Sequence, residues 1–402
     1  MDLEYRTPTA DELPTALRAV YAAFGEEAKE DDLQRDLERM PGERVLTAWD
    51  GGRPVGTTAS YPFELTVPGG HARAAGVTWV GVLPSHRRRG ILRELMRRQL
   101  EDVRERGEPL AILWASESAI YGRFGYGPAA PATRMEADRA AFALREDAGP
   151  RGRVRLLETD EAAEVLPPLY ERIGGARAGM LRRSPEWWRL GRLADPKHWR
   201  DGAGPKFVAL LELDGGPAGY ALYRIASKWE GGVPQGEVRV LEALAVSAEA
   251  TRELWRFLFG IDLVARVVLE LADPAWPLFL MVRDPRRLHL SVSDGLWLRL
   301  VDVEAALRAR AFADAPQAVL GVADDVLPGN AGRYAVGREA SRTEAEPDVA
   351  LHAADLASAY LGAFSFEQLA AAGRARELRP GGLARASALF ATPLPPYCPE
   401  GF

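Results

Sequence analysis

The sequence predicts a mixed α and β protein in three parts: two tandem units that each combine helices with a sheet, followed by a smaller α+β domain. Three observations lead to this prediction. A chain of 402 residues is too long for one ordinary hydrophobic core. The pattern of strand, Asp-Gly-Gly turn and strand at 45–59 recurs at 208–222. From about residue 287, short strand-like stretches mix with Ala-rich helices. We expect domains at 1–140, 150–286 and 287–402, with a linker at 140–155.

The composition excludes several classes of function. A net charge of −6 argues against nucleic acid as a partner. The single cysteine, Cys398, excludes an intrachain disulfide framework and fits a reducing cytoplasm. The first residues lack the pattern of a signal peptide, and no apolar run of membrane-spanning length follows. Arginine far outnumbers lysine, which is typical of a G+C-rich bacterial genome. We expect a cytoplasmic bacterial protein with no membrane contact and no metal site.

The first unit alternates helical and strand patterns. Residues 11–24 place apolar side chains three or four positions apart, which predicts an amphipathic helix, and a second helix at 30–40 ends at Pro41-Gly42. Glycine turns at 50–52 and 68–70 separate runs that are typical of strands. The expected strands are 3–6, 44–49, 54–67, 72–83 and 110–116, with a helix after Gly90 and a short helix beginning in the stretch 117–121.

The most informative stretch is 78–100, TWVGVLPSHRRRGILRELMRRQL. An apolar strand runs into a turn at Pro84-Ser85 and then into a helix rich in Leu and Arg. The first N–H groups of a helix lack internal partners, and the helix dipole adds positive potential there, so such a junction suits a phosphate. Gly90 lets a ligand approach the backbone closely. The alternative is a basic helix start on a solvated face.

Arginines beside this glycine supply positive charge and forked donors. We expect Arg87, Arg88, Gly90 and Ile91 to contact the phosphates, and Arg89 to face solvent or a neighbouring acid. The spacing matches neither GxxxxGK[ST] nor GxGxxG, so a P-loop and a dinucleotide fold are not supported.

The loop resembles the pyrophosphate loop of the GNAT superfamily of acyl-coenzyme A N-acyltransferases, Q/R-x-x-G-x-G/A, with Leu92 in place of the final small residue. The predicted order of helices and strands also matches that fold. The resemblance implies acetyl-CoA as a cosubstrate in a gap between the fourth and fifth strands. Val80 and Val82 on the fourth strand then pair with the thioester and pantetheine, with Gly81 as a bulge, and Ser116 forms a hydrogen bond to the cofactor or caps a helix.

The repeated pattern in the second unit lacks this loop. Val246 to Arg252 spans six positions, whereas Val82 to Arg93 spans eleven. The five missing residues correspond to the Arg-Gly phosphate loop. We therefore expect tandem GNAT-like units, the first competent to hold a cofactor and the second degenerate.

The whole chain resembles the Eis (enhanced intracellular survival) type of aminoglycoside-modifying acetyltransferase. The most specific stretches are PSHRRRGILR (84–93), ASESAIYGRFGYGP (115–128), DGLWLRLVDVEAAL (294–307) and the terminal phenylalanine. The resemblance implies a sterol-carrier-protein-like third domain that delivers the C-terminus to the active site. It also implies a homohexamer and acetylation of several amines of a small cationic substrate.

Amine acetylation needs a base for the amine, stabilisation of an oxyanion and an acid for the thiolate. The resemblance implies that Tyr121 is the acid, with Tyr126 as the other candidate. It implies that the base is the α-carboxylate of Phe402, which must be desolvated because a free carboxylate titrates near 3.5. His86 and Glu117 are the local alternatives, although His86 can instead flank the loop and Glu117 can cap the short helix.

A cationic ligand favours carboxylates and aromatic faces. The resemblance implies that Phe24 and Glu26, at the end of the first helix, are substrate contacts, and we expect Trp79 to contribute a wall of the pocket. The family's penultimate acid is Gly401 here, and the nearest acid is Glu400. A protein lysine or a polyamine is equally compatible as the substrate, and a longer acyl donor is also compatible. The rival functions are a lipid or sterol carrier that uses the third domain, and a non-catalytic scaffold. The intact loop of the first unit argues against both.

Overall fold

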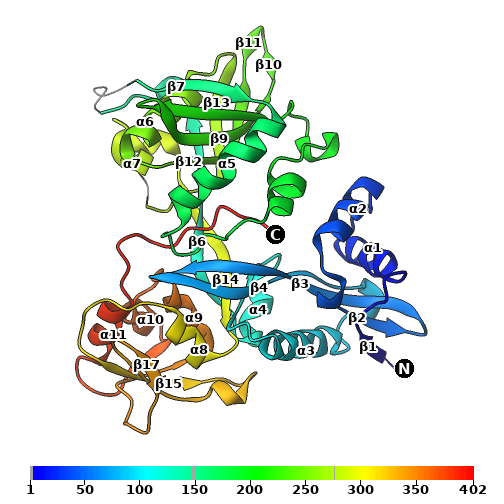
Figure 1. Ribbon diagram of the computed structural model, residues 1–402, viewed down its shortest axis with the longest axis vertical. Coiled ribbons are helices and arrows are strands. Elements are labelled where there is room, and N and C mark those ends of the chain that lie inside the picture. The colour runs from blue at the N-terminus through cyan, green and yellow to red at the C-terminus, as the bar shows by residue number, and fades with distance from the viewer. Residues whose placement is uncertain (1–2, 146–150, 276) are drawn as a thin grey trace. The chain divides into compact units, whose positions relative to one another are not determined.

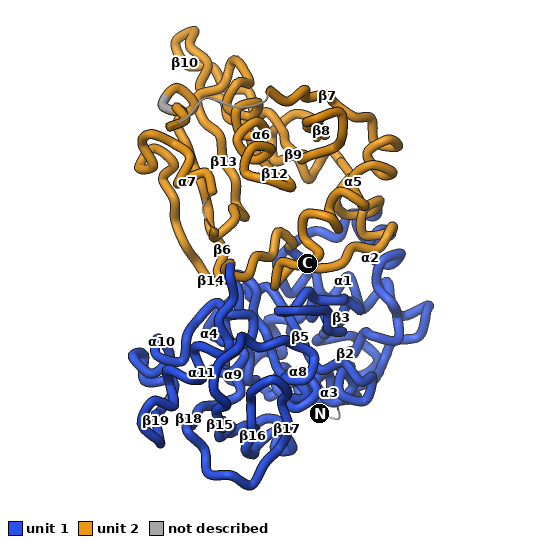
Figure 2. Tube along the Cα trace, turned by 60° about the vertical axis from the view of Figure 1, so that its left-hand side comes forward, with its two compact units in different colours: residues 1–130, 295–393, 401–402 blue, residues 131–294, 394–400 orange. Residues whose placement is uncertain are grey.

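The computed structural model describes residues 3–145, 151–275 and 277–402. The chain forms two compact units that are discontinuous in sequence (Figure 2). Unit 1 contains residues 1–130, 295–393 and 401–402, and unit 2 contains 131–294 and 394–400. The predicted third domain therefore belongs mostly to unit 1. Part of the predicted linker, 146–150, lies outside the described residues.

The GNAT-like part of unit 1 is built on a sheet with the strand order β1-β2-β3-β4-β5-β14 (Figure 1). Neighbours run antiparallel except for β4 and β5, which are parallel. The strands are β1 (Leu3–Arg6), β2 (Val45–Asp50), β3 (Arg53–Val67), β4 (Gly70–Val82), β5 (Leu110–Trp114) and β14 (Ser291–Leu300). The helices are α1 (Leu13–Phe24), α2 (Glu30–Arg39), α3 (Ile91–Glu105) and α4 (Ser118–Tyr121).

Strands β4 and β5 diverge, and this divergence positions the site. They pair from Ala74↔Leu110 to Gly76↔Ile112, after which β4 continues alongside β3 as far as Val82. The apolar face of α3, which includes Leu95 and Met96, packs on this part of the sheet and is fully buried.

A bulge interrupts β4 within the divergent part. We predicted this bulge at Gly81, but it lies at the two preceding residues. The register places Thr57 opposite Gly81 and Ala59 opposite Thr78, so that Trp79 and Val80 share one partner. Trp79 adopts a φ of 53°, and its carbonyl accepts a hydrogen bond of 2.8 Å from the Thr57 hydroxyl. Gly81 serves a different purpose: a Cβ there would lie 3.0 Å from that of Ala23, so the glycine lets α1 pack closely.

The remainder of unit 1 is an α+β fold, as we predicted for the third domain. Its sheet has the order β17-β16-β15-β18-β19. Its strands are β15 (Ala318–Ala323), β16 (Gly332–Val336), β17 (Ala340–Arg342), β18 (Val349–His352) and β19 (Ala375–Glu377). Its helices are α8 (Val303–Ala309), α9 (Ala353–Tyr360), α10 (Phe366–Ala371) and α11 (Gly382–Phe390).

Unit 2 repeats the plan of the GNAT-like sheet with the order β6-β13-β12-β9-β8-β7. The strands are β6 (Gly127–Asp138), β7 (Arg153–Leu157), β8 (Phe207–Leu213), β9 (Gly216–Ala226), β12 (Gly236–Ala245) and β13 (Val264–Ala272), with a small hairpin of β10 (Trp229–Glu230) and β11 (Val233–Pro234). The helices are α5 (Thr159–Gly174), α6 (Ala248–Gly260) and α7 (Pro277–Met281). Residues 83–90 separate β4 from α3, but only residues 246–247 separate β12 from α6, so the loop missing from the sequence is also missing from the fold.

Candidate active site

The loop between β4 and α3 has the backbone of an anion site. Arg88 and Gly90 have φ values of 64° and 82°. Gly90 occupies the N-cap position of α3 and offers no side chain to the first N–H groups of the helix. A Cβ added at Gly90 would meet no described atom within 4 Å, so the space in front of the helix is open. This helix start can therefore accept a phosphate.

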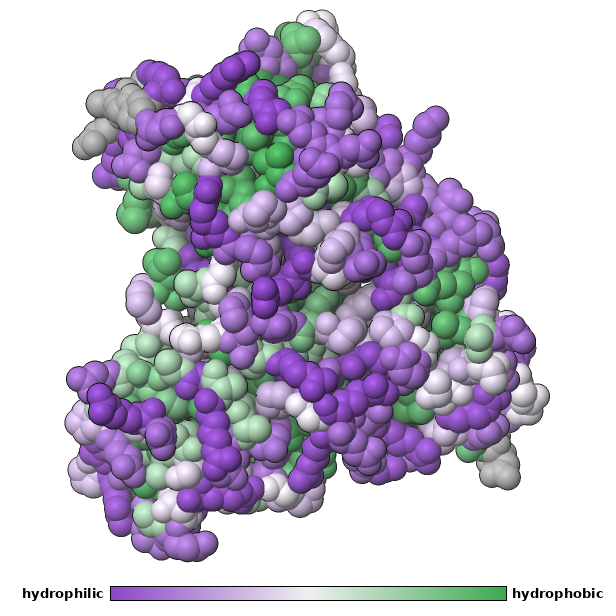
Figure 3. Space-filling model, viewed as in Figure 1, coloured by the Kyte–Doolittle hydropathy of each residue, from purple (hydrophilic) through white to green (hydrophobic). Residues whose placement is uncertain are grey.

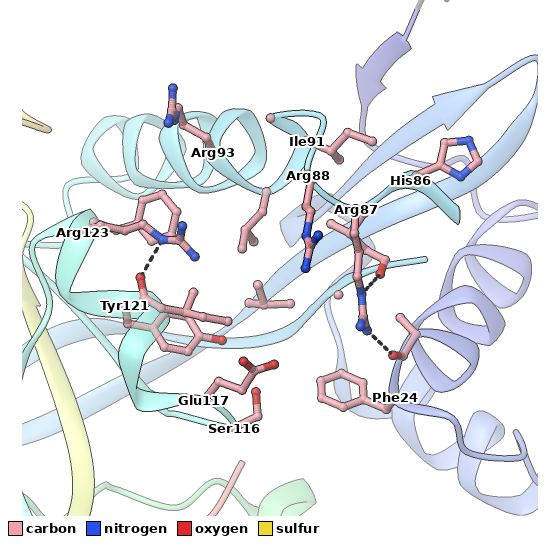
Figure 4. Close-up of a pocket in the computed structure, with 18 residues that line it drawn as sticks. Phe24, His86, Arg87, Arg88, Ile91, Arg93, Ser116, Glu117, Tyr121 and Arg123 are labelled. Atoms are coloured by element: carbon pink, nitrogen blue, oxygen red, sulfur yellow. Dashed lines mark hydrogen bonds between the residues drawn. The ribbon is translucent and has the colours of Figure 1, made fainter. Parts of the chain in front are cut away.

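A cavity of about 760 Å³ lies between this loop, the divergent end of β4 and helix α4 (Figure 4). Its described lining consists of Ala23, Phe24, Val80, Gly81, Val82, His86, Arg87, Arg88, Gly90, Ile91, Leu92, Arg93, Ser116, Glu117, Ile120, Tyr121, Arg123 and Phe124. This volume lies in the range of small-molecule and cofactor sites. The lining contains all seven residues that the sequence indicated for cofactor binding.

The arginines of the loop differ in their roles. The Arg88 side chain points into the cavity (Figure 4). Arg87 donates hydrogen bonds to the carbonyls of Val82 at 3.2 Å and Ala23 at 3.1 Å, so its guanidinium ties the end of β4 to the end of α1. Arg89 lies outside the described lining. Arg88 is thus the loop arginine best placed for an anion.

The positions of Tyr121 and Tyr126 distinguish the two candidates for the acid. The Tyr121 hydroxyl points into the cavity (Figure 4), although only 4% of the residue is exposed. Burial raises the pKa of the Tyr121 phenol, an effect that the nearby Ser116 hydroxyl partly offsets. The Tyr126 ring packs edge-on against Tyr121 at 6.1 Å and lies outside the described lining. Tyr121 is therefore the phenol that a bound thioester can reach.

The local alternatives for the base are placed differently from one another. Glu117 takes the N-cap position of α4, but its side chain forms no capping hydrogen bond to the described residues, so the predicted cap is wrong. Glu117 instead points into the cavity beside Ser116 (Figure 4). His86 lies at the outer edge, where its ring nitrogens contact the Ser85 hydroxyl at 2.8 Å and the Asp50 carboxylate at 3.2 Å.

The last residue of the chain is packed against the sheet of unit 1. The ring of Phe402 meets that of Phe63 edge-on, with centroids 5.0 Å apart. A Cβ at Gly76 would lie 3.3 Å from the Phe402 ring. Gly76 is the residue at which the pairing of β4 with β5 ends. Phe402 therefore lies at the start of the divergence, although the described cavity lining does not include it.

Of the predicted substrate contacts, only one belongs to the described lining of the cavity. Phe24 lines the cavity and is 48% exposed. Glu26 is exposed and lies outside the described lining, as does Trp79. Trp79 packs instead against the core between α1 and α2, where its neighbours are Leu17 and Leu33.

Glu400 does not face a substrate site. It is 1% exposed within unit 2, where it forms an ion pair with Arg183 and accepts a hydrogen bond of 3.0 Å from the Trp187 indole. Three residues earlier, the Tyr397 N–H donates to the Ala178 carbonyl at 2.8 Å. The segment before the C-terminus is thus firmly attached to unit 2, in contrast to the frayed end that is usual for chain termini.

Sequence reasoning missed Arg93 and Arg123, which also line the cavity. Arg123 follows Tyr121 by two positions and donates to the Ile120 carbonyl at 3.0 Å. Its place within the IYGRFG stretch was an available signal. Arg93 is exposed on the first turn of α3, where an arginine in sequence looks like any solvated charge.

No group of three or more His, Cys, Asp or Glu side chains among the described residues is arranged to hold a metal ion. No described helix is both long enough and apolar enough to span a bilayer.

Comparisons with known proteins agree with this architecture. Family models described as acetyltransferase (GNAT) domains match residues 4–129 and 179–300, and one described as a sterol carrier protein domain matches 303–399. The chain is 34% identical to N-acetyltransferase Eis of Mycobacterium tuberculosis, with 97% of each chain covered. The crystal structure of Eis1 from Mycobacterium abscessus covers 100% of both chains, with a TM-score of 0.87 and 34% identity. The chain belongs to the Eis family of GNAT N-acetyltransferases.

Membership of the Eis family confirms the predicted fold class of two GNAT-like units followed by a sterol-carrier-protein-like domain. An uncharacterised N-acetyltransferase of Streptomyces coelicolor is 42% identical over 100% of both chains. A GCN5-related N-acetyltransferase from Anabaena variabilis shares the fold, with a TM-score of 0.85 at 19% identity. This Eis-family chain is thus an N-acetyltransferase of the GNAT type.

Proposed function

We propose that this Eis-family chain transfers the acetyl group of acetyl-CoA to amines of a cationic substrate, and that aminoglycosides, acetylated at several positions, are the substrate class. One observation carries the proposal: a single cavity joins an open helix N-terminus at Gly90 to a buried phenol at Tyr121. The first feature suits a phosphate, and the second suits proton transfer to a thiolate.

The cavity fits coenzyme A in charge as well as in size. Among the described lining residues, four are arginines and one, Glu117, carries a carboxylate. Gly90, Arg88 and the first N–H groups of α3 would hold the pyrophosphate. The divergent backbone at Val80 and Val82 would pair with pantetheine and the thioester.

The reaction needs two proton transfers. As the amine nitrogen bonds to the acetyl carbon and the carbon–sulfur bond breaks, Tyr121 gives its proton to the departing thiolate. A tyrosine phenol is protonated at neutral pH, and burial raises the pKa of this one further, so the proton is present for transfer. The α-carboxylate of Phe402 takes the proton of the amine. The support for this role is the packing of Phe402 at Gly76, where β4 and β5 part.

Fewer residues support the proposed binding of the amine substrate than support the binding of acetyl-CoA. Phe24 offers an exposed aromatic face to a cation, and Glu117 offers a carboxylate inside the cavity. Glu26 remains a proposal from the family resemblance, and Trp79 remains a proposal for the wall, although both lie outside the described lining. Glu400 is excluded from contact with substrate by its burial against Arg183. The homohexamer and the cytoplasmic location belong to the same proposal, and the hexamer is checked by light scattering behind size exclusion.

Thiol release from acetyl-CoA with a panel of aminoglycosides tests the proposal. We expect turnover by the intact chain, and a loss of one hundredfold or more in kcat for Tyr121→Phe and for a chain lacking Phe402, with acetyl-CoA binding retained. Tyr126→Phe is the matched control, because that phenol lies outside the cavity and its buried hydroxyl has no hydrogen-bond partner among the described residues.

Three other outcomes would each refute one part of the proposal. Unchanged turnover after removal of Phe402 refutes the terminal base and favours Glu117 or His86. Turnover with spermidine or a lysine peptide, but with no aminoglycoside, refutes the substrate class and leaves the transferase chemistry in place. Absence of acetyl-CoA binding refutes the assignment of the cavity.

A further inference from the structure

Unit 2 contains a second divergence of parallel strands. β12 and β13 pair from Gly236↔Val264 to Val240↔Leu269. Beyond that point β12 continues alongside β9 to Ala245, while β13 pairs with β6 at Ala272↔Thr133. This is the arrangement that opens the cofactor cavity between β4 and β5 in unit 1.

A cavity of about 340 Å³ lies at this second divergence, which is large enough for a small ligand. Both strands contribute to its wall, and so do helices α6 and α7. Its described lining is Met135, Ile173, Ala176, Arg177, Met180, Ala243, Leu244, Ala245, Thr251, Trp255, Leu269, Ala272, Asp273, Pro277, Leu278, Phe279, Leu288, Leu290, Leu394 and Tyr397. In Figure 3, apolar residues reach the surface of unit 2 beside α7 and β12. The wall is thus mainly aliphatic and aromatic.

The start of α6 makes this cavity unsuitable for a phosphate. The Ser247 hydroxyl already accepts a hydrogen bond of 3.2 Å from the Ala250 N–H. Glu249 adds a negative charge in the first turn. Neither a glycine nor an arginine occupies the two residues between β12 and α6. Acetyl-CoA is therefore a poor match for this site.

The charges on the wall neutralise one another. The Arg177 guanidinium pairs with the Asp273 carboxylate at 2.8 Å and donates to the Pro395 carbonyl at 2.7 Å. An ionised ligand would have to compete with this pair. We propose that the cavity between β12 and β13 is a binding site for a neutral, apolar molecule, distinct from the acetyl-CoA cavity of unit 1.

Fluorescence of N-phenyl-1-naphthylamine, a neutral apolar probe, tests the site on the full chain. Ala243 lines the cavity and is partly exposed, so Ala243→Phe places a ring in the cavity. We expect saturable enhancement with the native chain and at least tenfold weaker binding with Ala243→Phe. Val246→Phe is the matched control, because Val246 is 42% exposed and lies outside the described lining. Its affinity should stay within twofold of the native value.

Two competitors complete the test. Decanamide should displace the probe, and saturating acetyl-CoA should not. Unsaturable fluorescence, equal affinity in Ala243→Phe, or displacement by acetyl-CoA would overturn the proposal. If the melting temperature shows that Ala243→Phe does not fold, Thr251→Phe fills the cavity from α6 and is judged by the same criteria.

Discussion

Replacement of Glu400 by alanine should detach the C-terminal segment from unit 2. The carboxylate is buried against Arg183 and the Trp187 indole, and the Arg183 side chain is 0% exposed. Removal of one partner of a buried ion pair typically costs about 3–5 kcal/mol, because the remaining charge is left uncompensated. Glu242 also pairs with Arg183 and softens this loss, so we expect the lower end of that range, ~3 kcal/mol.

The backbone N–H of Tyr397 reports this loss locally. A local destabilisation of about 3 kcal/mol corresponds to a fall in its hydrogen-exchange protection on the order of one hundredfold. Glu270→Ala is the control, because Glu270 is 69% exposed in its ion pair with Arg134, and exposed pairs contribute little. A change in Tyr397 protection of less than twofold in Glu400→Ala would refute the reasoning. The kcat should fall as well, since Phe402 follows Glu400 by two residues.

Three further predictions concern the loop, the sheet and the buried charges. Arg88→Gln should raise the KM for acetyl-CoA about tenfold in steady-state assays, in line with the loss of one charged hydrogen bond, and Arg89→Gln should change it less than twofold. Gly76→Ala should lower the melting temperature and kcat together, because its Cβ would lie 2.3 Å from the Phe63 ring; an unchanged melting temperature would contradict this. Burial alone would raise the pKa of Glu242, but Arg183 and Arg192 lower it to about 2. Its stabilising contribution should therefore be complete above about pH 4.5 and be lost as the pH falls towards 2, which acid titration followed by circular dichroism will show.

Much of the fold was predictable because its signals are local. The Asp-Gly-Gly turns, the apolar spacing of α1 and the Arg-Gly loop each follow from a few neighbouring residues. The loss of the loop from the second unit could be read from spacing alone. Short strands such as β17, Ala340–Arg342, were missed because three residues carry no alternation.

The candidate site was less predictable because its geometry depends on contacts between distant segments. At the bulge in β4, the Thr57 hydroxyl of the neighbouring strand donates to the Trp79 carbonyl. A contact between two strands cannot be read from the local sequence, which pointed to Gly81 instead. Glu400 looks like a surface acid in sequence, and only the fold brings Arg183 to it. Arg93 has no local feature that distinguishes it from other exposed arginines of α3.

The hydrogen bonds of Arg87 have a kinetic consequence. A guanidinium carries five N–H donors, and two of its nitrogens already hold the carbonyls of Val82 and Ala23. The remaining terminal nitrogen, Nη1, has two N–H groups that could donate to a pyrophosphate. In the proposed complex, the same side chain would join the cofactor to the end of α1, where Phe24 forms part of the wall. Prior occupation of the loop by the nucleotide would stiffen that wall, and steady-state kinetics should show ordered addition, with the acyl donor first and the acceptor second.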